Sequence, residues 1–216
     1  MTKTYAYSPE TIIKAYSLGV FPMAESRTAA DIQFYEPDIR GILPLDPPHV
    51  PRRLLKLVRQ KHYHVSIDAD FKAVIEACAA PSITRDDSWI NDEIIRLYCT
   101  LHKMGFAHSV EVWEGHTLIG GLYGVRLGQA FFGESMFSRR SNASKIALTH
   151  LIARLYHAGF HLLDAQFSND HLLQFGLQEI PKELFKKKLA TALSAHSDFP
   201  VNVSEDEALS YLVQAR

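Results

Sequence analysis

HSVEVWEGHTLIGGLYGVRLGQAFFGE, residues 108–134, is the stretch that decides the fold class. It holds three apolar segments, at 108–113, 118–125 and 129–134, which are rich in β-branched and aromatic residues. Turn residues separate these segments at 114–116 and near Gly128. Strand-forming segments joined by such short turns predict three antiparallel strands in a meander.

The residues after this meander predict a helix and then a further strand. Ser141 or Asn142 is a suitable helix cap and Gly159 a suitable helix end, and apolar residues between them recur at helical spacing, at Leu148, Leu151, Ile152 and Leu155. FHLLDAQF at 160–167 follows as a strand, which must pair in parallel with the third strand of the meander. This is the core order of the N-acetyltransferase superfamily, in which the strands splay and the acyl donor lies in the gap.

The chain before residue 107 is predicted to be mostly helical. Ser8-Pro9-Glu10 opens a helix that Gly19 closes, because serine caps helices and proline and acids favour the first turn. Further helical patterns lie at about 68–80 and 89–104.

The prolines of the N-terminal part, and the change from helical to strand patterns near residue 107, define the expected domain organisation. A turn is predicted at 21–23, and five prolines between 36 and 51 predict an extended, rigid loop instead of a helix or central strand. The sequence therefore predicts an α+β protein with a mixed sheet. A mostly helical domain at 1–107 is expected to precede an N-acetyltransferase-like domain at 108–216.

Three polar side chains interrupt the apolar strands. Glu134 follows Gly133 at the end of the third strand, and an ionised carboxylate in apolar surroundings needs a partner. Asp164 and Gln166 lie two residues apart, so the strand period of two points both side chains to one face. The three side chains are expected to converge on one cleft.

Composition limits the class of protein. The 216 residues are 47% hydrophobic and 22% charged, which is ordinary for a folded domain, and the formal net charge is -1. The sequence shows no signal peptide and no apolar run of about 18 residues, so a cytoplasmic protein that does not span a membrane is expected. Cys78 and Cys99 form no CxxC pair, and His62 with His64 lacks further ligands, so neither a disulfide nor a metal site is expected.

A basic segment raises the question of a nucleic-acid partner. Between Pro51 and His64 the chain has no acid and five basic residues: Arg52, Arg53, Lys56, Arg59 and Lys61. Lys186–Lys188 forms a second basic cluster. Such a segment either binds phosphates or is a solvated helix face, and the pattern alone leaves both interpretations open.

Seven blocks, spread over nearly the whole chain, carry a family resemblance. They are YSLGVFPM at 16–23, EPDIRGILPL at 36–45, SWI at 88–90, HSVEVW at 108–113, GGLYGV at 120–125, FGESMFSRRSNASKIAL at 132–148 and LLDAQFSNDHL at 162–172. On these blocks the chain resembles the leucyl/phenylalanyl-tRNA protein transferases. The resemblance implies an aminoacyltransferase that moves leucine or phenylalanine from aminoacyl-tRNA to proteins beginning with arginine or lysine. This transfer marks them for degradation by the N-degron route, without acetyl-CoA or a metal.

The resemblance also implies roles for the polar residues. Asp164 and Gln166 would prime the attacking amine, and Gln166 would orient it, because an amide oxygen accepts hydrogen bonds but is not a base. Glu134 would hold a cation, either the N-terminal residue of the acceptor or the ammonium of the donor. A purely positional mechanism, in which water or the terminal ribose hydroxyl carries the proton, stays open.

Donor choice requires an apolar slot, because leucine and phenylalanine side chains offer nothing polar. The candidate walls are Leu122, Phe131, Gly133, Met136, Leu151 and Leu163. The binding free energies of apolar side chains in such a slot differ by only about 1 to 3 kcal/mol per methylene. Methionine is therefore expected to be a poorer donor, not an excluded one. The terminal adenosine of the tRNA needs an aromatic side chain on which to stack. The resemblance assigns this role to Trp89. Phe34 and Tyr35 stand where most of the family has a second tryptophan.

The segment SRRSNAS at 138–144 bears on the choice of donor. It lacks the glycines with which acetyl-CoA enzymes of this fold hold pyrophosphate, and its Arg139 and Arg140 could face a nucleic-acid phosphate. Two rival interpretations remain. One is an acyl-CoA-dependent N-acyltransferase of the same fold, and the other is an RNA-binding module that uses residues 52–61.

Overall fold

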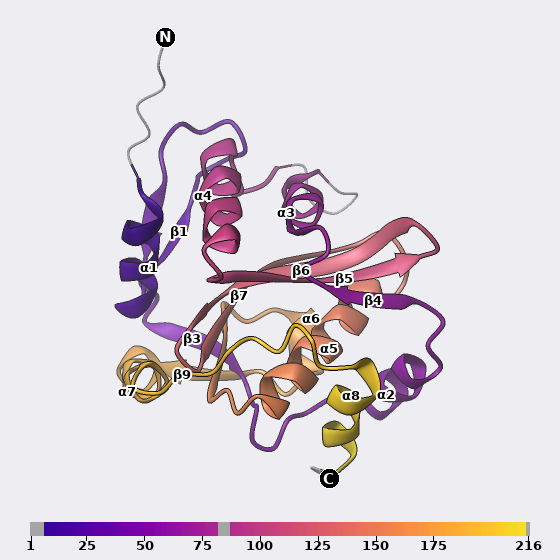
Figure 1. The fold of residues 1–216 in the computed structure, drawn as a ribbon. Helices are drawn as coiled ribbons and strands as arrows, with labels where there is room; N and C mark the ends of the chain where they lie inside the picture. Colours follow the sequence, from indigo (N-terminus) through magenta and orange to yellow (C-terminus); the bar gives the residue numbers. More distant parts are fainter. Residues whose placement is uncertain (1–6, 82–86, 215–216) are drawn as a thin grey trace.

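A seven-stranded mixed sheet forms the centre of the computed structural model, which describes residues 7–81 and 87–214 (Figure 1). In spatial order its strands are β4 (His64–Ile67), β5 (Ala107–Glu114), β6 (Thr117–Leu127), β7 (Ala130–Ser138), β8 (Leu162–Gln166), β3 (Ile39–Leu43) and β9 (Gln178–Pro181). β5, β6 and β7 pair antiparallel, which confirms the predicted meander. The α+β class with a mixed sheet is also confirmed.

β7 and β8 separate after a short paired segment. They run parallel, as predicted, and pair only between Ala130–Phe132 and Leu162–Asp164. Beyond Phe132, β7 stays paired with β6 as far as Ser138, whereas β8 pairs with β3 as far as Gln166. The two strands therefore diverge beyond their paired segment.

Helices cover both faces of the sheet (Figure 1). One face carries α1 (Pro9–Ser17), α3 (Phe71–Ala79) and α4 (Asp92–Lys103). The other carries α5 (Ala143–His157), with α2 (Arg52–Arg59) and α8 (Glu205–Gln214) packed against it. The short α6 (Asp170–Leu173) follows β8, and α7 (Lys182–Leu193) follows β9. Because strand side chains alternate, Phe131 and Phe132 enter the two different cores.

Local signals define the helix ends. The Ser8 side chain accepts the Thr11 N–H at 3.3 Å and caps α1, and Gly19 follows the helix with a φ of 82°. α4 begins at Asp92 after an Asn91 cap, three residues later than the pattern suggested. α5 begins after Asn142, as one of the two predicted caps, although its side chain makes no capping hydrogen bond.

Two predictions for the N-terminal part are wrong. Residues 21–23 form a strand, β1 (Phe21–Met23), which pairs with β2 (Gln33–Tyr35), and not a turn. The stretch 36–51 is not an extended loop throughout, because β3 lies inside the sheet and pairs with both β8 and β9. Pro37 and Pro44 flank the five residues of β3, so neither proline removes a hydrogen-bond donor from that strand.

The central sheet contains strands from both parts of the chain. β3 and β4 come from before residue 107, and the other five strands come from after it. A domain boundary near residue 107 stays a prediction. Among the helices of the described residues, none has the length and apolar character needed to cross a membrane.

Candidate active site

A cavity of about 1420 Å³ opens where β7 and β8 diverge. Residues 133–139 line one side of it and residues 163–166 the other, while α5 contributes Leu148 and Leu151. Most residues predicted to wall a donor slot line this cavity: Leu122, Gly133, Met136, Leu151 and Leu163. Phe131 is absent from the described lining, because it is fully buried and stacks on Phe199 with 5.5 Å between the ring centroids.

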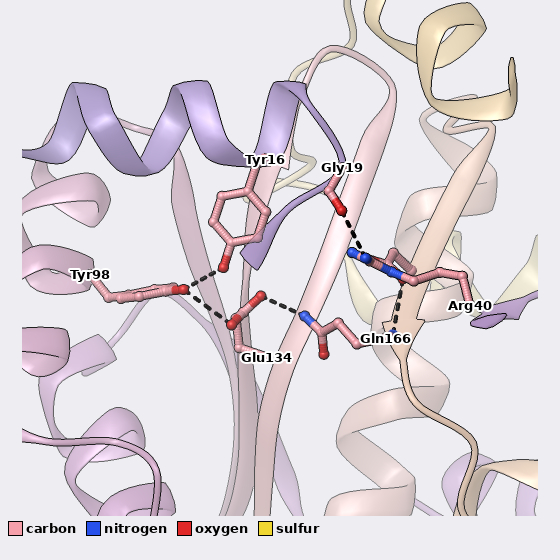
Figure 2. A network of polar contacts seen from close by, with 7 residues as sticks. Tyr16, Gly19, Arg40, Tyr98, Glu134 and Gln166 are labelled. Atoms are coloured by element: carbon pink, nitrogen blue, oxygen red, sulfur yellow. Dashed lines mark hydrogen bonds and ion pairs between the residues drawn. The ribbon is translucent and has the colours of Figure 1, made fainter. Parts of the chain in front are cut away.

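Glu134 joins a hydrogen-bond network at this cavity (Figure 2). Gln166 Nε2 donates to Glu134 Oε1 at 2.8 Å, and the Tyr98 hydroxyl donates to Oε2 at 3.1 Å. A hydrogen bond also joins the hydroxyls of Tyr98 and Tyr16. Glu134 and Gln166 therefore converge as expected, and both are buried, at 9% and 7% exposure.

The surroundings of Glu134 change its acidity. Burial raises the pKa of the Glu134 carboxyl from 4.5 to about 7, although hydrogen bonds from Tyr16 and Tyr98 oppose the rise. Burial, and then the charge of Glu134, raises the pKa of both tyrosine hydroxyls well above 10, so they stay neutral. A carboxyl that titrates near neutral pH can both take up and release a proton there.

Asp164 is paired with a buried arginine. Arg40 of β3 donates from Nε to Asp164 Oδ1 at 2.9 Å and from Nη2 to Oδ2 at 2.6 Å. The guanidinium carbon lies 4.6 Å from the ring centroid of Phe21 and 4.4 Å from that of Phe185. Such a bidentate pair supplies the partner that a buried carboxylate requires.

Gln166 ends β8 in a left-handed backbone conformation. Its φ is 58°, a region that costs a residue other than glycine about 1–2 kcal/mol. The Gln166 N–H donates to Asp164 Oδ1 at 2.9 Å, so Asp164 stabilises this conformation. Among the described residues, none donates a hydrogen bond to Gln166 Oε1, and Figure 2 shows this oxygen turned away from Glu134. It can therefore accept a hydrogen bond from a substrate.

Three members of this network were missed at the level of sequence: Arg40, Tyr16 and Tyr98. Arg40 and Tyr16 stand inside the blocks EPDIRGILPL and YSLGVFPM, so the resemblance itself could have pointed to them. Tyr98 offered only an inward position on a helix, which any core residue shares.

Comparisons with known proteins now identify the family. A model of the leucyl/phenylalanyl-tRNA protein transferase family matches residues 42–190, and a model of the N-terminal domain of the same family matches residues 6–38. The chain belongs to this transferase family. Its resemblance to aminoacyltransferases is thereby confirmed.

Individual relatives agree with the family models. A leucyl/phenylalanyl-tRNA–protein transferase of Hyphomonas neptunium is 55% identical over 89% of this chain and 75% of its own length. The protein of the same name from Maricaulis maris is 50% identical over 96% of this chain and 98% of its own length. A solved structure of a conserved protein of unknown function from Staphylococcus epidermidis covers 81% of this chain and 65% of its own. Its TM-score of 0.41 at 10% identity is too low to support a conclusion.

The aromatic residues assigned to the terminal adenosine of the family's tRNA substrate lie outside the described cavity lining. Trp89 is half-buried just before α4, and Phe34 of β2 is 37% exposed. Tyr35 stacks on Phe21 at 6.3 Å, and the Phe21 ring also covers Arg40. A role of these three residues in adenosine binding stays a prediction.

The basic segment that was predicted to contact tRNA forms the exposed face of α2. The exposed side chains of this helix include four cations: Arg52, Arg53, Lys56 and Arg59. The opposite face of the helix buries Leu54, Leu55 and Val58. None of the four forms an ion pair within the part of the chain that is described. Lys61, just beyond the helix, differs because its Nζ lies 2.6 Å from Asp206 Oδ1.

Arg139 and Arg140 leave the end of β7 in different directions. Arg139 lines the cavity, and its Nη1 donates to the Leu118 carbonyl at 2.9 Å. Arg140 is exposed, with its Nε 3.5 Å from Glu114 Oε2. Contact of either arginine with tRNA stays a prediction.

Proposed function

We propose that this protein transfers leucine or phenylalanine from aminoacyl-tRNA to the N-terminal arginine or lysine of acceptor proteins. The proposal is carried by the contact between Glu134 and Gln166 at a cavity between two diverging strands, in a chain of the transferase family. The order of three antiparallel strands, a helix and a parallel strand supports an N-acetyltransferase-like arrangement, with the acyl donor in the gap.

The apolar part of the cavity suits the donor side chain. Leu122, Leu151, Leu163 and Met136 line it, and such walls match leucine or phenylalanine without offering a polar partner. Met136 is flexible and can adapt to either shape. Because a methylene changes binding in such a slot by only about 1–3 kcal/mol, methionine is proposed as a poorer third donor.

The polar residues suit aminolysis of the ester. The acceptor amine attacks the ester carbonyl carbon, a C–N bond forms, the C–O bond to the tRNA breaks, and a proton passes from the nitrogen to the leaving ribose oxygen. Gln166 Oε1 accepts a hydrogen bond from the amine, and Glu134 stabilises the positive charge beside it. Asp164 acts through the backbone of Gln166.

A transfer assay tests this proposal directly. The purified protein is incubated with Leu-tRNA and with peptides that begin with arginine, lysine or alanine. We expect the arginine and lysine peptides to gain the mass of one leucine and the alanine peptide to stay unchanged. Transfer from acetyl-CoA, or tRNA binding without any transfer, would contradict the proposal.

The exposed cations of α2 are proposed to bind the phosphates of the tRNA. Replacing Arg52 and Lys56 together with alanine should weaken tRNA binding and lower the slope of log Kd against log salt by about 2, because two phosphate contacts are lost. Filter binding at several salt concentrations measures this slope. Lys72→Ala, which removes an exposed lysine from α3, is the matched control. An equal loss in the control would show that α2 is not the binding surface.

The biological setting follows from the proposed reaction. Adding leucine or phenylalanine to an N-terminus changes the residue that an N-degron pathway reads, so we propose that the product is destined for degradation. A cytoplasmic location, where charged tRNA and such acceptors occur together, is part of the same proposal.

A further inference from the structure

We infer that Arg40 is a positioning residue for the transfer reaction, which holds Asp164 and thereby fixes Gln166 against Glu134. This inference rests on the proposed function, because it assigns a role within that reaction. The buried Arg40–Asp164 pair would then position Gln166 for the reaction in addition to stabilising the fold. Three sets of contacts link Arg40 to Glu134, and Figure 2 shows part of them.

The first contact fixes Arg40 itself. Its three donor nitrogens are all used: Nε and Nη2 donate to Asp164, and Nη1 donates to the Gly19 carbonyl at 2.8 Å. The rings of Phe21 and Phe185 lie close to the guanidinium. Arg40 is only 1% exposed, so it does not touch a substrate. Any effect it has on the reaction must pass through its neighbours, and of these Asp164 is the one that is bonded to Gln166.

The second contact is the carboxylate of Asp164. Oδ1 accepts from both Arg40 Nε and the Gln166 N–H, while Oδ2 accepts from Arg40 Nη2. The side chain of Asp164 has an exposure of 0%. A substrate amine therefore does not reach this carboxylate as the fold stands. Asp164 is placed to hold the backbone of Gln166 and not to take the amine proton itself.

The third contact is made by Gln166. A left-handed backbone at a glutamine persists only where the surroundings stabilise it, and here the stabilising group is Asp164 Oδ1. In this conformation the side-chain amide reaches Glu134 Oε1. β3 also lies close to the end of β8. A Cβ added at Gly41 would come within 3.1–3.3 Å of the backbone at 167–168, so only glycine fits there without a shift. Arg40 and Gly41 together therefore define where β8 ends.

The test compares Arg40→Lys and Arg40→Met with the unchanged protein, at a temperature where circular dichroism shows each to be folded. Lysine keeps the charge but loses the two-pronged geometry, and methionine loses both. We expect single-turnover transfer from saturating Leu-tRNA to fall about tenfold with lysine and on the order of 100-fold with methionine, as for a misplaced reacting group. The Kd for Leu-tRNA should stay within about twofold, because Arg40 lies outside the α2 surface.

Arg154→Met is the matched control. Arg154 is also buried, at 4% exposure, but its Nη1 donates to the carbonyls of Pro200 and Val203, and it lies outside the described cavity lining. This variant should lose stability and keep its transfer rate per folded molecule. If the Arg40 variants kept their rate as well, or lost it only in proportion to unfolded protein, the inference would be overturned. Failure of the unchanged protein to transfer leucine would instead overturn the proposed function.

Discussion

Replacing Glu134 with glutamine lowers the rate of transfer by about 100-fold or more, which is the usual effect of removing one preorganised electrostatic group. Glutamine keeps the shape of the side chain and still accepts from Gln166 Nε2 through its own amide oxygen. It loses the negative charge that is proposed to stabilise the amine as its nitrogen becomes positive. Binding of Leu-tRNA should change little, because the tRNA phosphates are proposed to lie on α2.

Single-turnover transfer of labelled leucine from Leu-tRNA to an arginine-initiated peptide measures this effect. Glu111→Gln is the matched control, because Glu111 is also a buried carboxylate that accepts from the hydroxyls of Ser66 and Ser109 and lies outside the described cavity lining. We expect the control to transfer leucine at nearly the normal rate. An unchanged rate for Glu134→Gln would remove Glu134 from the reaction.

The second large effect concerns stability as a function of pH. Burial raises the pKa of the Glu134 carboxyl from 4.5 to about 7 in the folded protein, whereas the unfolded chain keeps the usual value. Between these two pH values the folded state binds more protons than the unfolded state, so the free energy of unfolding falls as the pH rises. The loss should reach about 3 kcal/mol and level off above pH 7 to 8, since one pKa unit corresponds to about 1.4 kcal/mol.

Urea unfolding of the unchanged protein and of Glu134→Gln, at several pH values from 4.5 to 8.5, isolates this contribution. All other titrating groups are common to both proteins, so they cancel in the difference. We expect Glu134→Gln to gain stability relative to the unchanged protein as the pH rises. Parallel stability curves would show that Glu134 does not carry a raised pKa.

The meander, α5 and the parallel strand β8 could be predicted because their signals are local. Each signal lies within one short window of sequence: the turn residues near Gly128, the apolar stripe of α5, and the strand period that places Asp164 and Gln166 on one face. The polar residues that interrupt the two strands were expected to converge, and Glu134 and Gln166 do so through a hydrogen bond. Short-range patterns thus indicated the two strands between which the cavity opens.

The rest could not be predicted because it depends on distant parts of the chain. Arg40 meets Asp164 across 124 residues, and Tyr16 meets Tyr98 across 82. Neither pairing follows from the spacing of residues on one element. β3 was hidden for the same reason, since its partners β8 and β9 come far later in the chain and the prolines around it resemble those of a loop.

The position of β3 has a consequence for synthesis of the protein on the ribosome. β3 is made early, but the strands on both sides of it, β8 and β9, lie beyond residue 161. Until they emerge, β3 lacks both neighbours and Arg40 lacks Asp164. Contacts of such long sequence separation form slowly, because the loop between them must close first. The nascent chain therefore has no complete site until β8 and β9 have been translated, and transfer activity cannot begin before residue 181 has been added.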